Sequence, residues 1–166
     1  MKQILTLLLF FVLSCGTAFS KDKAPEVQEI SIVGEGIGNG GRPVLVVTCA
    51  AKKADKVTFD ELCRCAVRCV LFKGWADKSK SASYDSSVSH PALAGNPDVE
   101  AQHIDYFNDF FSSGEASKYV DIVEDTRKVT KSGKQYQVSQ MVTVNVPALR
   151  SKLERDNIIK SLKSGW

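Results

Sequence analysis

Apolar residues between Thr58 and Lys73 fall three and four positions apart, a spacing that places side chains on one face of a helix. Thr58 and Glu61 form a Thr-x-x-Glu capping box, a pattern that satisfies two free amides at a helix start. Gly74 stands where such a helix would end. The pattern therefore predicts a helix over 58–73. Its apolar face consists of Phe59, Leu62, Cys63, Ala66, Val67 and Val70.

Two further helices are indicated by the same spacing. Asn96 and Pro97 are typical of a helix start, because asparagine caps a free amide and proline has its φ already fixed. Gly114 would end this helix, whose shared face holds an aromatic cluster. Pro147 would begin the third helix, and Asn157, which tolerates the left-handed conformation, would end it before a short strand or turn over 158–162. The shared faces are Val99, His103, Tyr106, Phe107 and Phe110, and then Leu149 and Leu153.

Two strand pairs complete the pattern. Residues 28–33 and 42–50 are predicted strands joined by 34–41, which has five glycines in eight residues and reads as a mobile hairpin connection. Residues 119–129 and 135–146 form the second pair, with a turn around Gly133. In the last strand every second residue is apolar, which is typical of a strand with one buried face. These residues are Tyr136, Val138, Val142, Val144 and Val146, with Gln140 as the polar exception.

The predicted order is β-β-α-loop-α-β-β-α. Sequential hairpins with few crossovers favour an α+β fold, in which helices cover one face of a largely antiparallel sheet. We therefore expect one domain over 28–166, with an antiparallel or mixed sheet of four to five strands and two to three helices on one face. Residues 75–95 are rich in Ser, Lys and Asp and are expected to form a long surface loop.

The N-terminus has the order of an export signal. Lys2 is followed by an apolar run over 4–13, which is shorter than the about 20 residues that span a bilayer. Ala18 and Ser20 are small residues at the positions that signal peptidase requires before a cleavage site, so cleavage before residue 21 would give a signal peptide over 1–20. A lipoprotein leader over 1–14 is the alternative, in which Cys15 carries the lipid. Residues 21–27 then read as a tether, and the predicted location is extracytoplasmic: periplasmic, or membrane-tethered through Cys15.

Composition narrows the classes of partner. The chain of 166 residues has 22 basic and 19 acidic side chains, and its net charge of +3 includes Lys2 of the leader. So small an excess gives no reason to expect a nucleic-acid partner, and membrane attachment is expected only through a lipid at Cys15. The charged fraction of 25% excludes a disordered tail or a fibrous repeat.

Four cysteines, Cys49, Cys63, Cys65 and Cys69, remain after either cleavage. A zinc site needs four convergent ligands, but at about 100° per residue Cys63 and Cys65 point to opposite sides of the helix. No metal or other cofactor is therefore expected. Export favours a disulfide over a metal site, and Cys49 shares strand parity with the residues expected to meet the helix start, so Cys49–Cys63 is the candidate pair. The alternative is that the cysteines are free and act as small buried apolar residues.

The two histidines, His90 and His103, are the candidate bases of a small exported hydrolase. His90 lies among serines that lack the Gly-x-Ser-x-Gly pattern of a serine nucleophile. His103 shares its helix with Glu100 and Asp105, but both carboxylates point away from it. No catalytic residue is therefore predicted. The aromatic residues in loops or at the end of the chain are expected to cover the core; they are Trp75, Tyr84 and Trp166. If they are grouped on the surface, the alternative is a site for a partner or a glycan.

Two stretches carry a family resemblance. FDELCRCAVRCVLFKGW is a helix that runs into a Gly-aromatic end, and VTVNVPALRSKLERDNIIKSL is a strand that runs into a helix. Together they resemble the small α+β envelope domains of the TolB N-terminal and curli-assembly-lipoprotein type, as well as uncharacterised exported proteins of Bacteroidetes-like bacteria. The resemblance spans about half of the chain after the leader and includes no catalytic motif. It implies a non-catalytic envelope module that acts through contacts with another, unidentified envelope protein.

Three functional hypotheses follow. The first is this exported, non-enzymatic module. The second is a small exported hydrolase that uses His103 or His90. The third is a thiol or zinc protein that uses Cys49, Cys63, Cys65 and Cys69.

Overall fold

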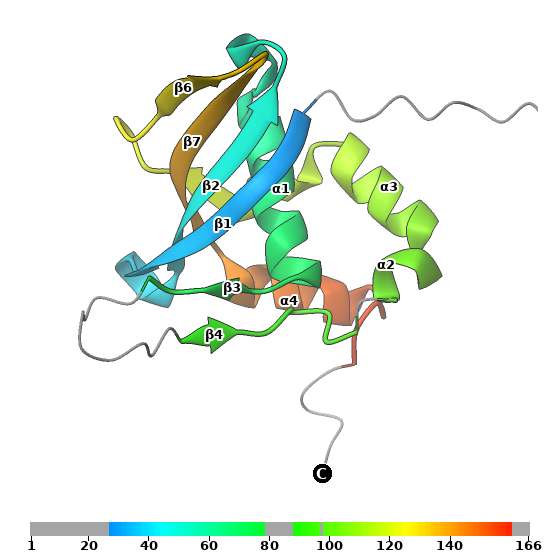
Figure 1. Cartoon of the computed structure of the whole chain (residues 1–166). Helices are drawn as coiled ribbons and strands as arrows, with labels where there is room; N and C mark the ends of the chain where they lie inside the picture. Colours follow the sequence, from blue (N-terminus) through cyan, green and yellow to red (C-terminus); the bar gives the residue numbers. More distant parts are fainter. Residues whose placement is uncertain (1–26, 79–87, 97, 161–166) are drawn as a thin grey trace, which may run out of the picture.

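An antiparallel sheet forms the centre of the computed structural model, which describes residues 27–78, 88–96 and 98–160 (Figure 1). The strand order is β1 (Val27–Ile37), β2 (Pro43–Ala51), β7 (Gln135–Val144) and β5 (Val120–Ile122), and β6 (Lys128–Ser132) also pairs with β7. Every pairing in this sheet is antiparallel. The predicted α+β class with a sheet of four to five strands is confirmed. The predicted leader with Cys15, the tether up to residue 26, Tyr84 and Trp166 lie outside the described residues.

Helix α1 (Phe59–Phe72) packs on one face of the sheet and is the element around which the core forms (Figure 1). Its start is as predicted, because the Thr58 hydroxyl accepts a hydrogen bond from the Glu61 amide at 3.3 Å. Gly74, with φ of 74°, follows its end. The helix is buried on more than its predicted face, since Cys65 and Cys69 are also nearly inaccessible. The sheet covers one side of α1, and the 3-10 helix η3 (Glu115–Tyr119) covers another.

The predicted second helix is two helices. α2 (Val99–Gln102) and α3 (Ile104–Ser112) meet at His103, whose φ of −123° and ψ of 39° break the helical path. The predicted aromatic face is nonetheless real: the Phe107 ring lies edge-on to Phe72 of α1, with ring centroids 5.0 Å apart. Phe107 is 1% exposed and therefore joins α3 to α1 in the core.

Helix α4 (Val146–Arg155) begins one residue before the predicted start. Asn145 is its cap, and the Asn145 side-chain oxygen accepts a hydrogen bond from the Ala148 amide at 3.1 Å. Asn157 has the positive φ expected of it, 58°. Residues 158–159 then form a bend, and residues 161–162 of the predicted strand or turn lie outside the described residues. Among the residues that the structure describes, no helix is both long enough and apolar enough to cross a membrane.

The predicted strand over 119–129 is wrong in its middle. β5 ends at Ile122, Asp125 has a φ of 57°, and β6 starts only at Lys128. The buried Gln140 side chain of β7 stabilises this break, because its amide donates to the Val123 carbonyl at 2.8 Å and to the Thr126 hydroxyl at 2.7 Å. Gln140, the one polar residue on the predicted buried face of β7, thus stabilises the turn between β5 and β6.

Replacement of Gln140 with leucine should lower the free energy of unfolding by about 1–3 kcal/mol, because the Val123 carbonyl and Thr126 hydroxyl lose a buried donor. Urea denaturation measures the change. Gln137→Leu is the matched control, since Gln137 lies on the same strand but its side chain is only half-buried and has no recorded hydrogen bond within the described residues. Equal losses in the two variants would contradict this role of Gln140.

The predicted surface loop over 75–95 contains a small second sheet. β3 (Trp75–Ala76) pairs antiparallel with β4 (Ser89–His90). The segment after β3 lies against β1, where the Lys78 amide donates to the Gly34 carbonyl at 2.9 Å. A Cβ at Gly34 would lie 2.0 Å from the Asp77 carboxylate, so glycine at this position permits the close approach. This contact fixes β3 and β4 beside the glycine-rich end of the β1–β2 hairpin.

Candidate functional site

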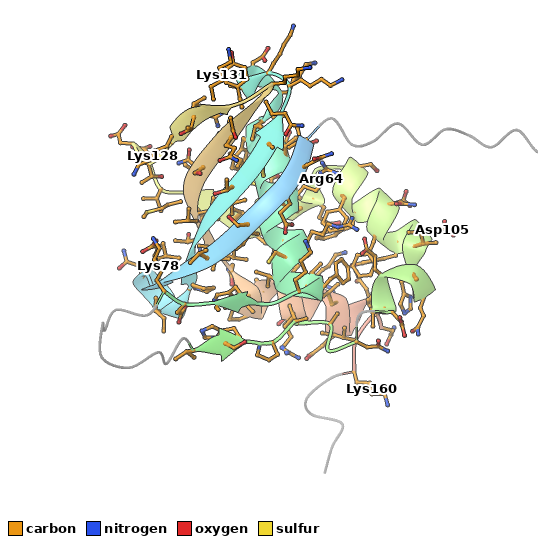
Figure 2. All side chains as sticks on the ribbon, in the orientation of Figure 1. Arg64, Lys78, Asp105, Lys128, Lys131 and Lys160 are labelled. Atoms are coloured by element: carbon orange, nitrogen blue, oxygen red, sulfur yellow. The ribbon has the colours of Figure 1, made fainter. Side chains whose placement is uncertain are left out.

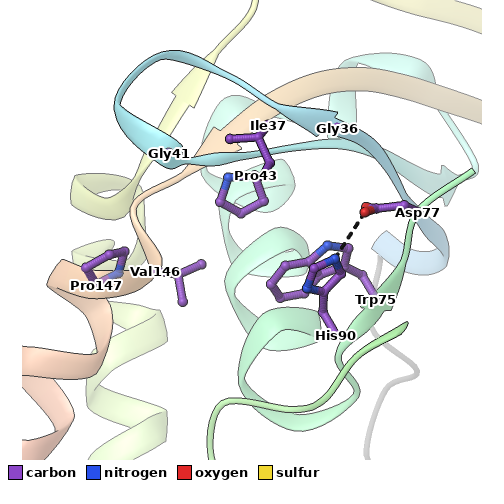
Figure 3. Close-up of a pocket in the computed structure, with 9 residues that line it drawn as sticks. All are labelled: Gly36, Ile37, Gly41, Pro43, Trp75, Asp77, His90, Val146 and Pro147. Carbon is purple, nitrogen blue, oxygen red and sulfur yellow. Dashed lines mark hydrogen bonds and ion pairs between the residues drawn. The ribbon is translucent and has the colours of Figure 1, made fainter. Parts of the chain in front are cut away.

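A mostly apolar pocket of about 270 Å³ opens where the β1–β2 hairpin, the β3–β4 pair and the start of α4 meet (Figure 3). Its lining residues are Gly36, Ile37, Gly41, Pro43, Trp75, Asp77, His90, Val146 and Pro147. Ile37 is 75% exposed at the edge of this pocket. We call it the Trp75 pocket.

Trp75 and His90 form one wall of the Trp75 pocket. The two residues are paired across β3 and β4, and their rings stack with centroids 4.6 Å apart and planes 12° apart. His90 Nε2 lies 3.1 Å from Asp77 Oδ2, the contact drawn as a dashed line in Figure 3. The His90 ring is therefore held in place by stacking on Trp75 and by its contact with the Asp77 carboxylate.

Asp77 was not a candidate in the sequence, although it is the partner of His90. Trp75 and Asp77 are two positions apart in an extended segment and so share a face. The pairing of that face with His90, 13 residues away, depends on the β3–β4 register. Within the described residues no serine, threonine or cysteine side chain has a recorded hydrogen bond to His90.

His103 lies at a break in the helical path rather than within a continuous helix. It lies at the break between α2 and α3, half-buried, and its side chain has no recorded hydrogen bond to a described residue. The Glu100 carboxylate instead pairs with Arg68 of α1 at 2.7 Å. The expectation that Glu100 does not orient His103 agrees with this geometry.

All four described cysteines are buried and free. The candidate bond between Cys49 and Cys63 is not present in the structure. Burial raises the pKa of Cys63 to about 12 and that of Cys69 to about 11. The Cys69 thiol donates to the Gly74 carbonyl at 3.0 Å. The part of the chain that the structure describes contains no group of three or more His, Cys, Asp or Glu residues arranged to hold a metal ion.

The chain was compared with protein-family models, with curated proteins and with solved structures, and no match was found in any of them. Its own geometry is therefore the basis for any functional inference. The Trp75 pocket has the apolar walls and few polar groups of a binding site.

Proposed function

We propose that this protein is an exported, non-catalytic module that binds another protein of the cell envelope, and that the Trp75 pocket receives one bulky apolar side chain of that partner. The observation that carries the proposal is the exposed Ile37 beside an apolar pocket with a stacked aromatic wall. An exposed apolar residue at the edge of a concave apolar surface is typical of an interaction site.

The size of the Trp75 pocket favours a side chain over a separate small molecule. Its volume of about 270 Å³ is below the roughly 300–1,000 Å³ of most small-molecule sites. One large apolar or aromatic side chain fits such a space. Partner proteins commonly place a single anchor residue of this kind in a pocket near the centre of an interface.

The surroundings of the Trp75 pocket add apolar area. Val88 is 59% exposed, and its carbonyl accepts a hydrogen bond from the Asp77 amide at 3.0 Å. Val88 thus lies directly across the hairpin from a residue of the pocket wall. Ile37 and Val88 together would pack around the anchor residue and shield it from water.

Export and the envelope location rest on the predicted leader, and the non-catalytic role agrees with the resemblance to TolB N-terminal and curli-assembly-lipoprotein domains. Both arguments come from the sequence. The Trp75 pocket adds a place at which such a module would meet its partner.

Site-specific photocrosslinking in the producing cell tests the proposal. A photoreactive amino acid at Val88 should capture one partner protein, and Ile37→Asp should abolish that product by placing a charge at the pocket edge. Val129→Asp is the matched control, because Val129 is 51% exposed but lies on β6. Thermal melts of both variants check folding. No product at Val88, or equal loss with Val129→Asp, would reject the proposal.

A hydrolase that uses His90 is the second candidate, because the Asp77–His90 contact is the arrangement that orients a catalytic base. Such an enzyme would lose turnover of model esters with Asp77→Asn, whereas a binding module has no turnover to lose. Measurable ester hydrolysis that disappears in this variant would favour the hydrolase over the binding module.

A further inference from the structure

Five exposed lysines gather at one end of the central sheet. Residues 51–56 and 131–136 contain all five, together with a single acidic residue, Asp55. We call these lysines the tip cluster; they are Lys52, Lys53, Lys56, Lys131 and Lys134. The net charge of only +3 for the whole chain therefore conceals a local concentration of positive charge.

The strand pairing brings the tip cluster together. Lys131 of β6 lies opposite Tyr136 of β7, and Tyr136 lies opposite Ala51 at the end of β2. Two lysines follow directly after Ala51, and the 3-10 helix η2 (Ala54–Lys56) then packs against β2 and β7. Lys134 lies in the turn between β6 and β7. Three neighbouring strands thus deliver the five lysines to the same end of the sheet.

Most of the tip cluster is not neutralised by neighbouring carboxylates. Within the described residues, four of its lysines, all except Lys56, have no recorded ion pair or side-chain hydrogen bond. Lysines elsewhere in the fold do have such partners: Lys73 pairs with Glu29 at 2.7 Å, and Lys78 pairs with Glu35 at 2.5 Å. The positive charge of the tip cluster is therefore available to an anionic partner.

The first described residue lies at the same end of the sheet. Val27 of β1 is opposite Ala51, the residue that precedes two lysines of the tip cluster. If the predicted lipid is attached to Cys15, twelve residue steps connect it to Val27, a chain that spans at most about 40 Å. A lipid chain and a basic patch together hold a protein on a membrane more firmly than either does alone. The predicted anchor thus leads to the end of the sheet that carries the tip cluster.

We propose that the tip cluster docks the domain on a membrane surface rich in anionic phospholipid. Lipid headgroups present many negative charges in one plane, so several exposed lysines can bind at once without a shaped pocket. Each lysine near such a surface strengthens binding by about fivefold. A lipid surface is favoured over an acidic protein because the predicted anchor leads to this end.

Docking through the tip cluster would turn the Trp75 pocket away from the bilayer. β1 starts beside the tip cluster and ends at Ile37, and its 11 residues span roughly 30–35 Å. Ile37 and Pro43 are paired at that far end, and both line the Trp75 pocket. Figure 2 shows Lys131 at one end of the molecule and Lys78, which follows β3, toward the other. The partner proposed above would thus reach the Trp75 pocket from the side opposite the lipid.

Vesicle co-sedimentation tests the proposal with the mature protein isolated from the producing cell. Vesicles of equal parts phosphatidylglycerol and phosphatidylcholine should bind the protein about tenfold or more tightly than vesicles of phosphatidylcholine alone. This preference should shrink as salt is added. A lipid at Cys15 would enter both kinds of vesicle, so the difference between them measures the protein surface. Equal binding to both kinds would overturn the proposal.

Two double variants that remove the same charge test where the lipid binds. Lys131→Gln with Lys134→Gln should weaken binding to the mixed vesicles by about tenfold or more. Lys118→Gln with Lys160→Gln is the matched control, because both lysines are exposed but lie outside the tip cluster, and it should change binding by less than about twofold. Thermal melts check that both variants fold. Equal losses, or no loss in the first variant, would overturn the assignment.

Photocrosslinking on the mixed vesicles tests the orientation. A photoreactive amino acid in place of Ser132, which is exposed at the end of β6, should crosslink to phosphatidylglycerol. One in place of Val88, near the Trp75 pocket, should not, and lipid products at both positions would contradict the orientation. Binding of polyglutamate without a preference for the mixed vesicles would assign the tip cluster to an acidic protein and overturn the proposal. Capture of a partner protein at Val88 is a separate result, so this proposal and the proposed function can fail independently.

Discussion

Phe107→Ala should lower the free energy of unfolding by about 3–5 kcal/mol, the usual cost of removing a buried phenylalanine. Phe107 is 1% exposed and contacts Phe72 edge-on at 5.0 Å between ring centroids. Tyr106 lies edge-on to the same ring at 5.2 Å, and Phe111 is 6.3 Å away. Alanine would leave a cavity among these three rings and would also remove the edge-to-face contacts with Phe72 and Tyr106.

Urea denaturation followed by circular dichroism measures this loss. Phe59→Ala provides the comparison, because Phe59 lies in the first turn of α1 and is 43% exposed. The loss for Phe59→Ala should be well under half of that for Phe107→Ala. Similar losses would show that the aromatic cluster between α1 and α3 does not stabilise the fold as described.

Gly74→Ala should both destabilise the protein and open the Trp75 pocket. A Cβ at Gly74 would lie 2.1 Å from the His90 carbonyl oxygen and 2.9 Å from the Ala92 amide nitrogen, so the β4 segment must move. The φ of 74° adds about 1–2 kcal/mol of backbone strain for any residue with a side chain. Because His90 stacks on Trp75, displacement of β4 would separate the two rings.

Gly95→Ala is the control that shows the cost of backbone strain without steric overlap of the added Cβ. Gly95 has a φ of 71°, but a Cβ there would have no atom within 4 Å. It should therefore show the strain alone, with the fluorescence of Trp75 unchanged when both variants are measured in a Trp166→Phe background. Gly74→Ala should melt at a lower temperature than Gly95→Ala and change the Trp75 emission. Equal melting temperatures would mean that β4 does not pack against Gly74.

Features of the fold that depend on residues close together in the sequence could be predicted. The cap at Thr58, the stop at Gly74 and the parity of the β7 residues all depend on spacings of a few positions, and the structure confirms them. The break between β5 and β6 was not predictable, because it depends on Gln140, whose partners Val123 and Thr126 lie 17 and 14 residues away.

The candidate sites were less predictable because each needs a long-range register. Asp77 meets His90 only through the β3–β4 pairing. The angle of about 100° per residue places Cys63 and Cys65 on different sides of the helix, but it could not show that both would be buried. Cys65 is buried without lying on the predicted apolar face, and the start of β1 lines the same hollow as Cys65.

β5 and β6 are two short strands that both pair with β7, in place of one long strand, and this limits self-association of the protein. A long continuous strand at the margin of a sheet offers a row of unpaired amides and carbonyls on which another chain can polymerise. Here that margin consists of the three residues of β5 and the five of β6, separated by the turn that Gln140 secures. β6 also bears Lys128 and Lys131 (Figure 2), and lysines on such a strand oppose the stacking of further chains. The Gln140 side-chain amide, which secures the turn between β5 and β6, therefore also makes the addition of further chains at this edge of the sheet less favourable.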